Sequence, residues 1–274
     1  MGRKPRVEFQ DAIYHVIQRG NNREYIFSRL ADKSYLLSII EEIKQNIPFL
    51  LLGYMIMDNH YHLMVKRGIV DLHKIMQRIN NLYSKNYNKQ NNRTGHVFEG
   101  RYKGILVKDD KYLLSLLRYV HQNPVQAHIC KSVKDYPWSS DRLYRNNINT
   151  LVYIDPILNI FSADRKTALE QYDIFMERLE PLDKEFYEER DTIEDIDQTS
   201  NELIVKHIQK KLDEILQGIC DDEQNFLLIK EGSRKRHLRD FKVKYVKEAL
   251  LHGYTLKNIG NNINISGEAV NKMV

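Results

Sequence analysis

Two histidines separated by one residue, His60 and His62, are the side chains whose type and spacing first suggest chemistry. Asp58-Asn59 precedes them and apolar runs lie on both sides, so the stretch predicts a β-hairpin with a tight turn. Side chains alternate between the two faces of a strand, which places both imidazoles on one face, where they can share a divalent metal. The alternative is that each is an ordinary hydrogen-bonded strand residue, because short patterns often match by chance.

A tyrosine on a predicted helix is the second chemical candidate. The helix is expected over 110–122, with an apolar stripe that packs on the sheet. Tyr119 lies about a quarter turn from that stripe, so its side chain can lean over the sheet edge, and Asn123 follows one turn later on the same side. The helix should stop near Asn123, because Pro124 cannot extend it. The chain has 17 tyrosines, so Tyr119 stands out only in combination with the histidine pair.

The elements that must position these residues follow a recognisable order. Strands are predicted over 12–19, 50–57, 60–67 and 97–108, and helices from Asp32, as N-cap, to about residue 46, then over 71–88 and 110–122. This is the split βαβ order of a ferredoxin-like α+β unit, βαββαβ followed by the helix that carries Tyr119. The hairpin strands can pair at the centre of an antiparallel sheet, with helices packed on one face.

Charge divides the chain into three parts. Residues 1–150 hold 24 Lys/Arg against 13 Asp/Glu, residues 151–230 hold 9 against 20, and residues 231–274 hold 9 against 4. Two basic parts around an acidic one suggest two surfaces that bind a polyanion, although solvated faces explain the pattern as well. We expect domains at 1–150 and 231–274, joined by a helical, acidic region over 151–230. Its stretch 180–201 is expected to be an exposed connector or a flexible acidic helix.

The C-terminal region predicts an all-α fold. A basic amphipathic helix is expected over 234–252. Residues 255–274 read as two short helices around a turn at Asn264, with Ser266 as the second N-cap. This fits a helix-turn-helix or an ordinary αα-hairpin, and the basic helix before it favours DNA binding, with duplex DNA as the ligand.

The remaining composition excludes some classes of protein. No apolar run approaches the ~18 residues of a membrane span, and the N-terminal residues show no signal-peptide core. Cys130 and Cys220 lie far apart without a Cys-x-x-Cys pattern. We expect a cytoplasmic protein with neither disulfides nor membrane contact.

Several spaced segments resemble one known family. They are Tyr14-His-Val-Ile-Gln-Arg-Gly-Asn-Asn-Arg23, Met57-Asp-Asn-His-Tyr-His-Leu63, Gly95-His-Val-Phe-Glu-Gly-Arg-Tyr-Lys103, Arg118-Tyr-Val-His-Gln-Asn-Pro-Val125 and Tyr136-Pro-Trp-Ser-Ser140. In order over the first 150 residues, they resemble the HUH single-tyrosine transposases, and within these the REP-associated tyrosine transposases. The sequence departs from relatives at His128, Ile129 and Asp141, so we expect its DNA specificity to differ, and the C-terminal extension is absent from the minimal transposase.

The resemblance implies a metal-dependent transposase acting on single-stranded, hairpin-forming DNA. His60 and His62 would hold Mg²⁺ or Mn²⁺, with Asn123 as third ligand, although some relatives carry Gln there. Tyr119 would attack the phosphorus and form a 5′-phosphotyrosine, with the cation or Arg118 favouring the phenolate. The expected DNA surface comprises Arg19, Asn21, Arg23, Arg101, Tyr102, Lys103 and Arg118.

Two other functions stay open: a non-catalytic DNA-binding regulator, and a phosphodiesterase in which water attacks instead of Tyr119. Monomer and homodimer are both compatible with the sequence. The sequence also predicts the geometry of the site: both imidazoles and the Tyr119 hydroxyl should converge on one exposed pocket.

Overall fold

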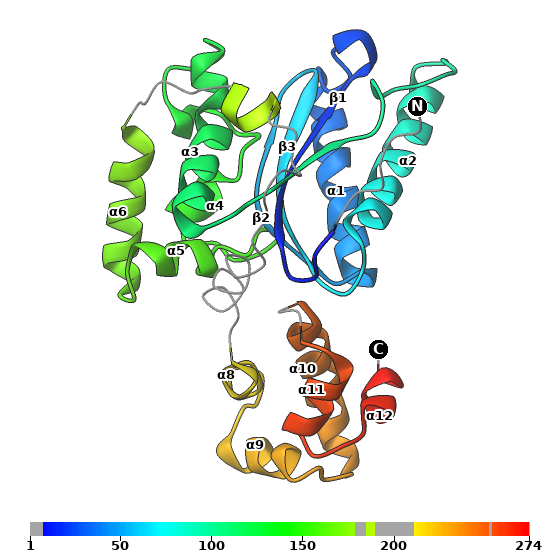
Figure 1. Cartoon of the computed structure of the whole chain (residues 1–274), viewed down its shortest axis with the longest axis vertical. Helices are drawn as coiled ribbons and strands as arrows, with labels where there is room; N and C mark the ends of the chain where they lie inside the picture. The colour runs from blue at the N-terminus through cyan, green and yellow to red at the C-terminus, as the bar shows by residue number, and fades with distance from the viewer. Residues whose placement is uncertain (1–7, 179–184, 190–210, 252–253, 274) are drawn as a thin grey trace.

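Four strands form one antiparallel sheet in the order β2-β3-β1-β4. They are β1 Ile13–Arg19, β2 Phe49–Ile56, β3 His60–Arg67 and β4 Lys103–Leu106. The computed structural model describes residues 8–178, 185–189, 211–251 and 254–273, and within them the sheet and its helices form an α+β fold followed by an all-α region (Figure 1). The predicted fold class is confirmed.

The β2–β3 hairpin turns at Asp58-Asn59, as predicted, with the Met57 amide donating to the His60 carbonyl over 2.8 Å. Only β3 of this pair is central, because β1 pairs with its other side and β2 forms the sheet edge. In the β1–β3 register Ile17 lies opposite His62 and His15 opposite Met64. Directly opposed residues share a face of the sheet, so β1 contributes side chains to the face that carries the histidine pair.

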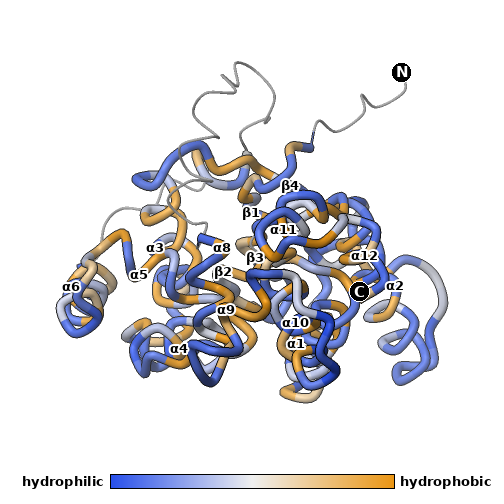
Figure 2. The backbone as a smooth tube through the Cα atoms, turned by 90° about the horizontal axis from the view of Figure 1, so that it is seen from below, coloured by the Kyte–Doolittle hydropathy of each residue, from blue (hydrophilic) through white to orange (hydrophobic). Residues whose placement is uncertain are grey.

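Helices cover both faces of the sheet rather than the one expected. Helices α1 Leu30–Asn46 and α2 Leu72–Gln90 lie on one side, and α3 Asp110–Gln126 lies on the other (Figure 1). Beside α3 lie three shorter helices, α4 Asp141–Arg145, α5 Asp155–Phe161 and α6 Arg165–Glu177. Hydrophobic and hydrophilic residues alternate along these helices, as Figure 2 shows, because each packs one face on the core.

Three predicted element ends were wrong. Helix α1 begins at Leu30 with Arg29 as its N-cap, and Asp32 instead binds the Arg29 guanidinium through two hydrogen bonds of 2.8 Å. Helix α3 continues through Pro124 to Gln126, because a proline in the last turn removes only one backbone hydrogen bond. Of the stretch 97–108, only Lys103–Leu106 is a strand, and Gly100 has φ +150°, which interrupts the extended chain.

The C-terminal helices form a core of their own. They are α8 Leu212–Gln217, α9 Glu223–Lys230, α10 Arg239–Leu251, α11 Leu256–Asn262 and α12 Gly267–Asn271. As predicted, Asn264 makes the turn with φ +54°, and the Ser266 side chain accepts from the Ala269 amide. Helix α9 had no expected counterpart, and part of the helical region expected over 151–230 lies outside the described residues.

Both cysteines are free. Among the residues that the structure describes, no helix has the length and apolar character needed to cross a membrane.

Candidate active site between the sheet and helix α3

Three histidines from two neighbouring strands form the floor of the candidate site. The rings of His60 and His62 lie 5.0 Å apart between centroids, on one face of β3 as predicted. His15 of β1 places its Nε2 atom 2.8 Å from Nδ1 of His62, and both side chains are fully buried. Burial disfavours the charged imidazolium and lowers the pKa of His15 to about 4, so His15 is neutral near pH 7.

Helix α3 brings Tyr119 over this floor. Its ring lies edge-on to His62, with centroids 5.8 Å apart, and its hydroxyl donates to Oε1 of Glu188 over 2.5 Å. The same Oε1 atom lies 3.9 Å from Nε2 of His62. The predicted convergence of the tyrosine with the histidine pair is therefore present in the fold.

The predicted exposure of this pocket was wrong. Tyr119 is fully buried, because Tyr187 stacks on it with ring centroids 4.4 Å apart and an interplanar angle of 20°. Tyr187 belongs to the π-helical turn Glu185–Glu189, the short yellow-green helix between α3 and the sheet in Figure 1. We call Phe186, Tyr187 and Glu188 the cover segment.

The cover segment is held from several sides. Both of its aromatic rings contact Tyr112 of α3, at centroid distances of 5.6 and 5.9 Å. Arg19 Nη2 lies 3.1 Å from Oε2 of Glu188, and Lys103 Nζ donates to the Glu188 carbonyl over 3.0 Å. These contacts correct the expectation of an exposed connector for this part of the stretch 180–201. The rest of that stretch lies outside the described residues.

One group of side chains has the donor atoms of a metal site. Ligand atoms of His60, His62 and Glu188 all lie within 4.8 Å of one another. Two imidazole nitrogens and one carboxylate oxygen form a set that suits several divalent cations. Glu188 was missed from the sequence because it is one of many carboxylates in an acidic stretch, where neither spacing nor periodicity distinguishes it.

The electrostatics around Tyr119 keep its phenol protonated. Burial, followed by the hydrogen bond to Glu188 and the charge of Glu188, raises the pKa of Tyr119 well above the usual tyrosine range. The neighbouring Asn123 side chain and the charge of Arg19 oppose that rise. Arg19 thus supplies the positive charge near the phenol that was predicted for Arg118. Asn123, the predicted third metal ligand, lies beside Tyr119.

Five of the predicted DNA-contacting residues lie in two places, a polar cavity and a short turn after β1. Arg19, Arg101 and Lys103 line a polar cavity of about 350 Å³ together with Glu99 and Glu188. Asn21 and Arg23 follow β1 in a short 3-10 turn, where Asn21 is half-buried and Arg23 is exposed. The surface positions of Arg19, Arg23 and Arg101 are compatible with phosphate contacts.

Two of those predictions do not fit the structure. The Tyr102 ring is buried, with 5% of its surface exposed, so it offers no open face for a base. Arg118 is 8% exposed and its guanidinium carbon lies 4.3 Å from the ring centroid of Phe175 in α6. In both cases the side chain packs inside the protein, and residue type alone does not predict that burial.

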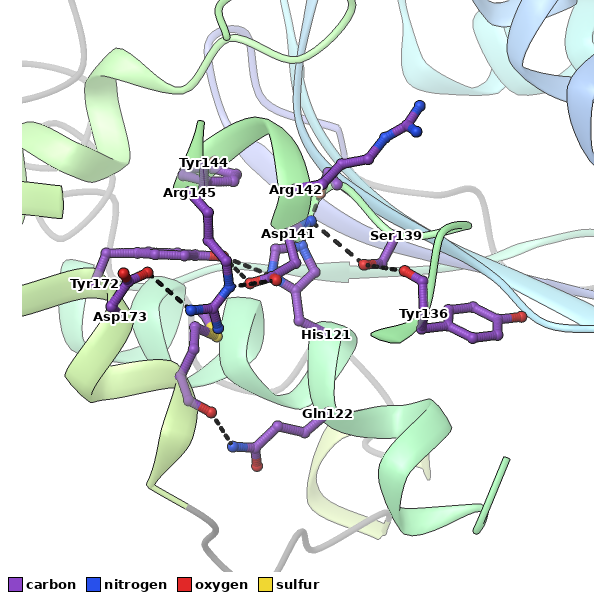
Figure 3. A network of polar contacts seen from close by, with 12 residues as sticks. His121, Gln122, Tyr136, Ser139, Asp141, Arg142, Tyr144, Arg145, Tyr172 and Asp173 are labelled. Atoms are coloured by element: carbon purple, nitrogen blue, oxygen red, sulfur yellow. Dashed lines mark hydrogen bonds and ion pairs between the residues drawn. The ribbon is translucent and has the colours of Figure 1, made fainter. Parts of the chain in front are cut away.

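A buried polar network fixes the opposite side of α3 (Figure 3). His121 contacts the Ser140 hydroxyl at 2.7 Å and the Tyr172 hydroxyl at 3.1 Å, and Tyr172 donates to Asp141 over 2.7 Å. His121 therefore serves the packing of α3 and is not placed to bind phosphate. Asp141, one of the departures from relatives, is the shared acceptor of Tyr172 and Arg145.

The first part of the chain is similar to known proteins. Residues 8–123 match the family described as "Transposase IS200 like". A Haemophilus influenzae protein, described as a REP-associated tyrosine transposase, is 29% identical over an alignment of 127 residues that covers 39% of this chain and 72% of that protein.

Two solved structures are also similar. One, a REP-associated tyrosine transposase bound to a REP hairpin, has a TM-score of 0.46 and 17% identity, covering 56% of this chain and 91% of the other. The second, a transposase from Deinococcus radiodurans, has a TM-score of 0.32 and 16% identity, covering 44% and 97%. The family match and the curated relative agree that residues 8–123 are similar to IS200-like transposases.

Proposed function

We propose that this protein is a transposase that cleaves and rejoins single-stranded DNA through a covalent bond to Tyr119. The observation that carries the proposal is the meeting of His60, His62 and Tyr119, which come from one strand and a helix about sixty residues later.

His60, His62 and Glu188 would hold the divalent cation, Mg²⁺ or Mn²⁺. Their donor atoms are close enough to share one ion, and Asn123 is the alternative third ligand. When bound, the metal supplies a Lewis acid that polarises a phosphate oxygen.

The residues of the chain account for the bond changes. The Tyr119 oxygen attacks phosphorus, the bond from phosphorus to the 3′-oxygen breaks, and that oxygen leaves as a 3′-hydroxyl after taking up a proton. Glu188 already accepts a hydrogen bond from the phenol, so its carboxylate is placed to receive the phenolic proton. Attack of another 3′-hydroxyl on the phosphotyrosine reverses these changes and joins new ends.

Entry of DNA requires movement of Tyr187 in the cover segment. The Tyr187 ring lies on the Tyr119 ring, so a phosphate can reach Tyr119 only when the Tyr187 ring moves aside, while Glu188 stays beside the phenol. Arg19 and Lys103 would then exchange their contacts with Glu188 for contacts with phosphate oxygens. A cytoplasmic location is part of this proposal, because a DNA substrate is available there.

The test is covalent trapping. The full chain is incubated with Mn²⁺ and end-labelled single-stranded hairpin DNA, starting with repeats of the class that names the Haemophilus relative. A labelled adduct that survives denaturation is expected from wild type and should be absent from Tyr119→Phe. Cleavage without an adduct would identify water as the nucleophile, and binding without cleavage would identify a regulator.

A further inference from the structure

The C-terminal domain contains a basic pocket that lies outside the region matched to the transposase family. The pocket has a volume of about 670 Å³ and is formed by two segments distant in sequence. One wall is the loop 232–236 with the start of α10, and the other is the turn before α12 with α12 itself. Five basic side chains line it: Arg234, Lys235, Arg236, Arg239 and Lys242.

The two walls are joined by specific contacts. Gly232 has φ +78°, and a Cβ atom at this position would lie 2.6 Å from the Asn264 carbonyl oxygen, so only glycine permits the close approach. Lys242 is buried, and its Nζ donates to the Ser233 carbonyl over 2.5 Å, which fixes the loop over α10. The cluster of cations therefore sits on a defined surface rather than along a single solvated helix.

Charge in the pocket is unbalanced. Arg234, Lys235, Arg236 and Arg239 are exposed, and no carboxylate is among the described residues that line the pocket. Clustered cations repel one another, and an anion that binds several of them relieves that repulsion. The spacing of several cations along one rim suits consecutive phosphates of a nucleic acid.

The lining also distinguishes duplex from single-stranded nucleic acid. Sites for single strands depend on aromatic side chains on which bases stack, and the described lining of this pocket includes no aromatic residue. Its wall α12 is the second helix of the helix-turn-helix-like pair, a motif that docks on duplex DNA. We infer that this pocket binds the phosphate backbone of double-stranded DNA, and so provides a second DNA site independent of the tyrosine chemistry.

The experiment compares two charge-matched variants of the full chain by fluorescence anisotropy with a labelled blunt duplex. The pocket variant is Arg234→Glu/Arg236→Glu/Arg239→Glu, and the control is Lys244→Glu/Lys247→Glu/Lys257→Glu, three exposed lysines of the same domain that do not line the pocket. The pocket variant should bind duplex about 100-fold more weakly, and the slope of log Kd against log salt should fall by about three. The control should stay within about threefold of wild type.

Further measurements separate this proposal from the proposed cleavage. Tyr119→Phe should bind duplex like wild type, and the pocket variant should still form the covalent adduct on an isolated hairpin and melt at the wild-type temperature. Equal weakening of the pocket variant and the control would overturn the proposal. So would full competition by an unstructured single strand of equal length.

Discussion

The Nε2 atom of His15 lies 2.8 Å from Nδ1 of His62, in a hydrogen bond between two buried imidazoles of neighbouring strands. A hydrogen on Nδ1 of His62 leaves the lone pair of Nε2 directed toward Glu188, which is the arrangement a metal ligand needs. With Nε2 of His15 as the acceptor of that hydrogen, His15 would position a proposed ligand without touching the metal itself.

Replacing His15 tests this positioning role. His15→Phe fills similar space but offers His62 no acceptor, so Mn²⁺ affinity should fall about 10- to 100-fold. His15→Gln offers a carbonyl oxygen and should recover most of that affinity. Mn²⁺ titration followed by electron paramagnetic resonance gives both values, and DNA binding in EDTA should be equal for the two variants. Equal Mn²⁺ affinity in wild type and His15→Phe would show that His15 only packs.

The third metal ligand can be identified by comparing two variants. Glu188→Ala should weaken Mn²⁺ binding more than Asn123→Ala, because a carboxylate is the stronger ligand for a hard cation and Glu188 lies within reach of both histidines. The same titration provides the measurement. A larger loss in Asn123→Ala would instead assign the amide as the ligand when the site is loaded.

Uncovering Tyr119 should accelerate adduct formation. Tyr187→Ala removes the ring stacked on Tyr119, and such a pair contributes about 0.5–1.5 kcal/mol, which corresponds to a rate increase of about 2- to 10-fold. Phe186→Ala is the matched control, because Phe186 contacts Tyr112 and Tyr187 in the same cover segment. Initial rates of adduct formation on hairpin DNA would decide. A slower Tyr187→Ala variant would mean that this ring helps to hold the substrate.

Buried neutral histidines should make the fold sensitive to acid. Burial lowers the pKa of His121 to about 4, below the ordinary value of about 6.5. The unfolded chain therefore binds a proton first as the pH falls, so the stabilisation is complete above pH ~6.5 and is lost between pH ~6.5 and ~4. Urea unfolding from pH 7 to 4.5 in EDTA should show a declining free energy of unfolding.

Two substitutions isolate the contribution of His121. His121→Gln keeps polar atoms in the network but cannot titrate, so its decline with pH should be shallower than that of wild type, from a lower starting stability. His96→Asn, at an exposed histidine, is the control. Identical slopes in all three proteins would refute the assignment.

The sheet, the hairpin turn and the histidine face were predictable because they depend on local patterns. Apolar runs around Asp58-Asn59 determine the turn, and the two-residue period of a strand places His60 beside His62. The apolar stripe of α3 similarly oriented Tyr119 toward the histidine pair. These features require only neighbours in sequence and a core to pack against.

The partners that complete the site required information that local patterns lack. Glu188 reaches Tyr119 across 69 residues, and His15 reaches His62 across 47. Arg118 and Tyr102 have residue types suited to DNA contact, yet packing against Phe175 and burial decide their surroundings. Pro124 does not end α3 as predicted, because it lies within the last turn of the helix, where a proline is tolerated.

The cover segment lies some sixty residues beyond the end of the family match at residue 123. The histidine pair and Tyr119 therefore lie within the segment that matches the family, whereas access to Tyr119 depends on a short stretch outside that segment. A substitution of Tyr187 alone would therefore change access to Tyr119 while leaving the histidine pair and Glu188 unaltered.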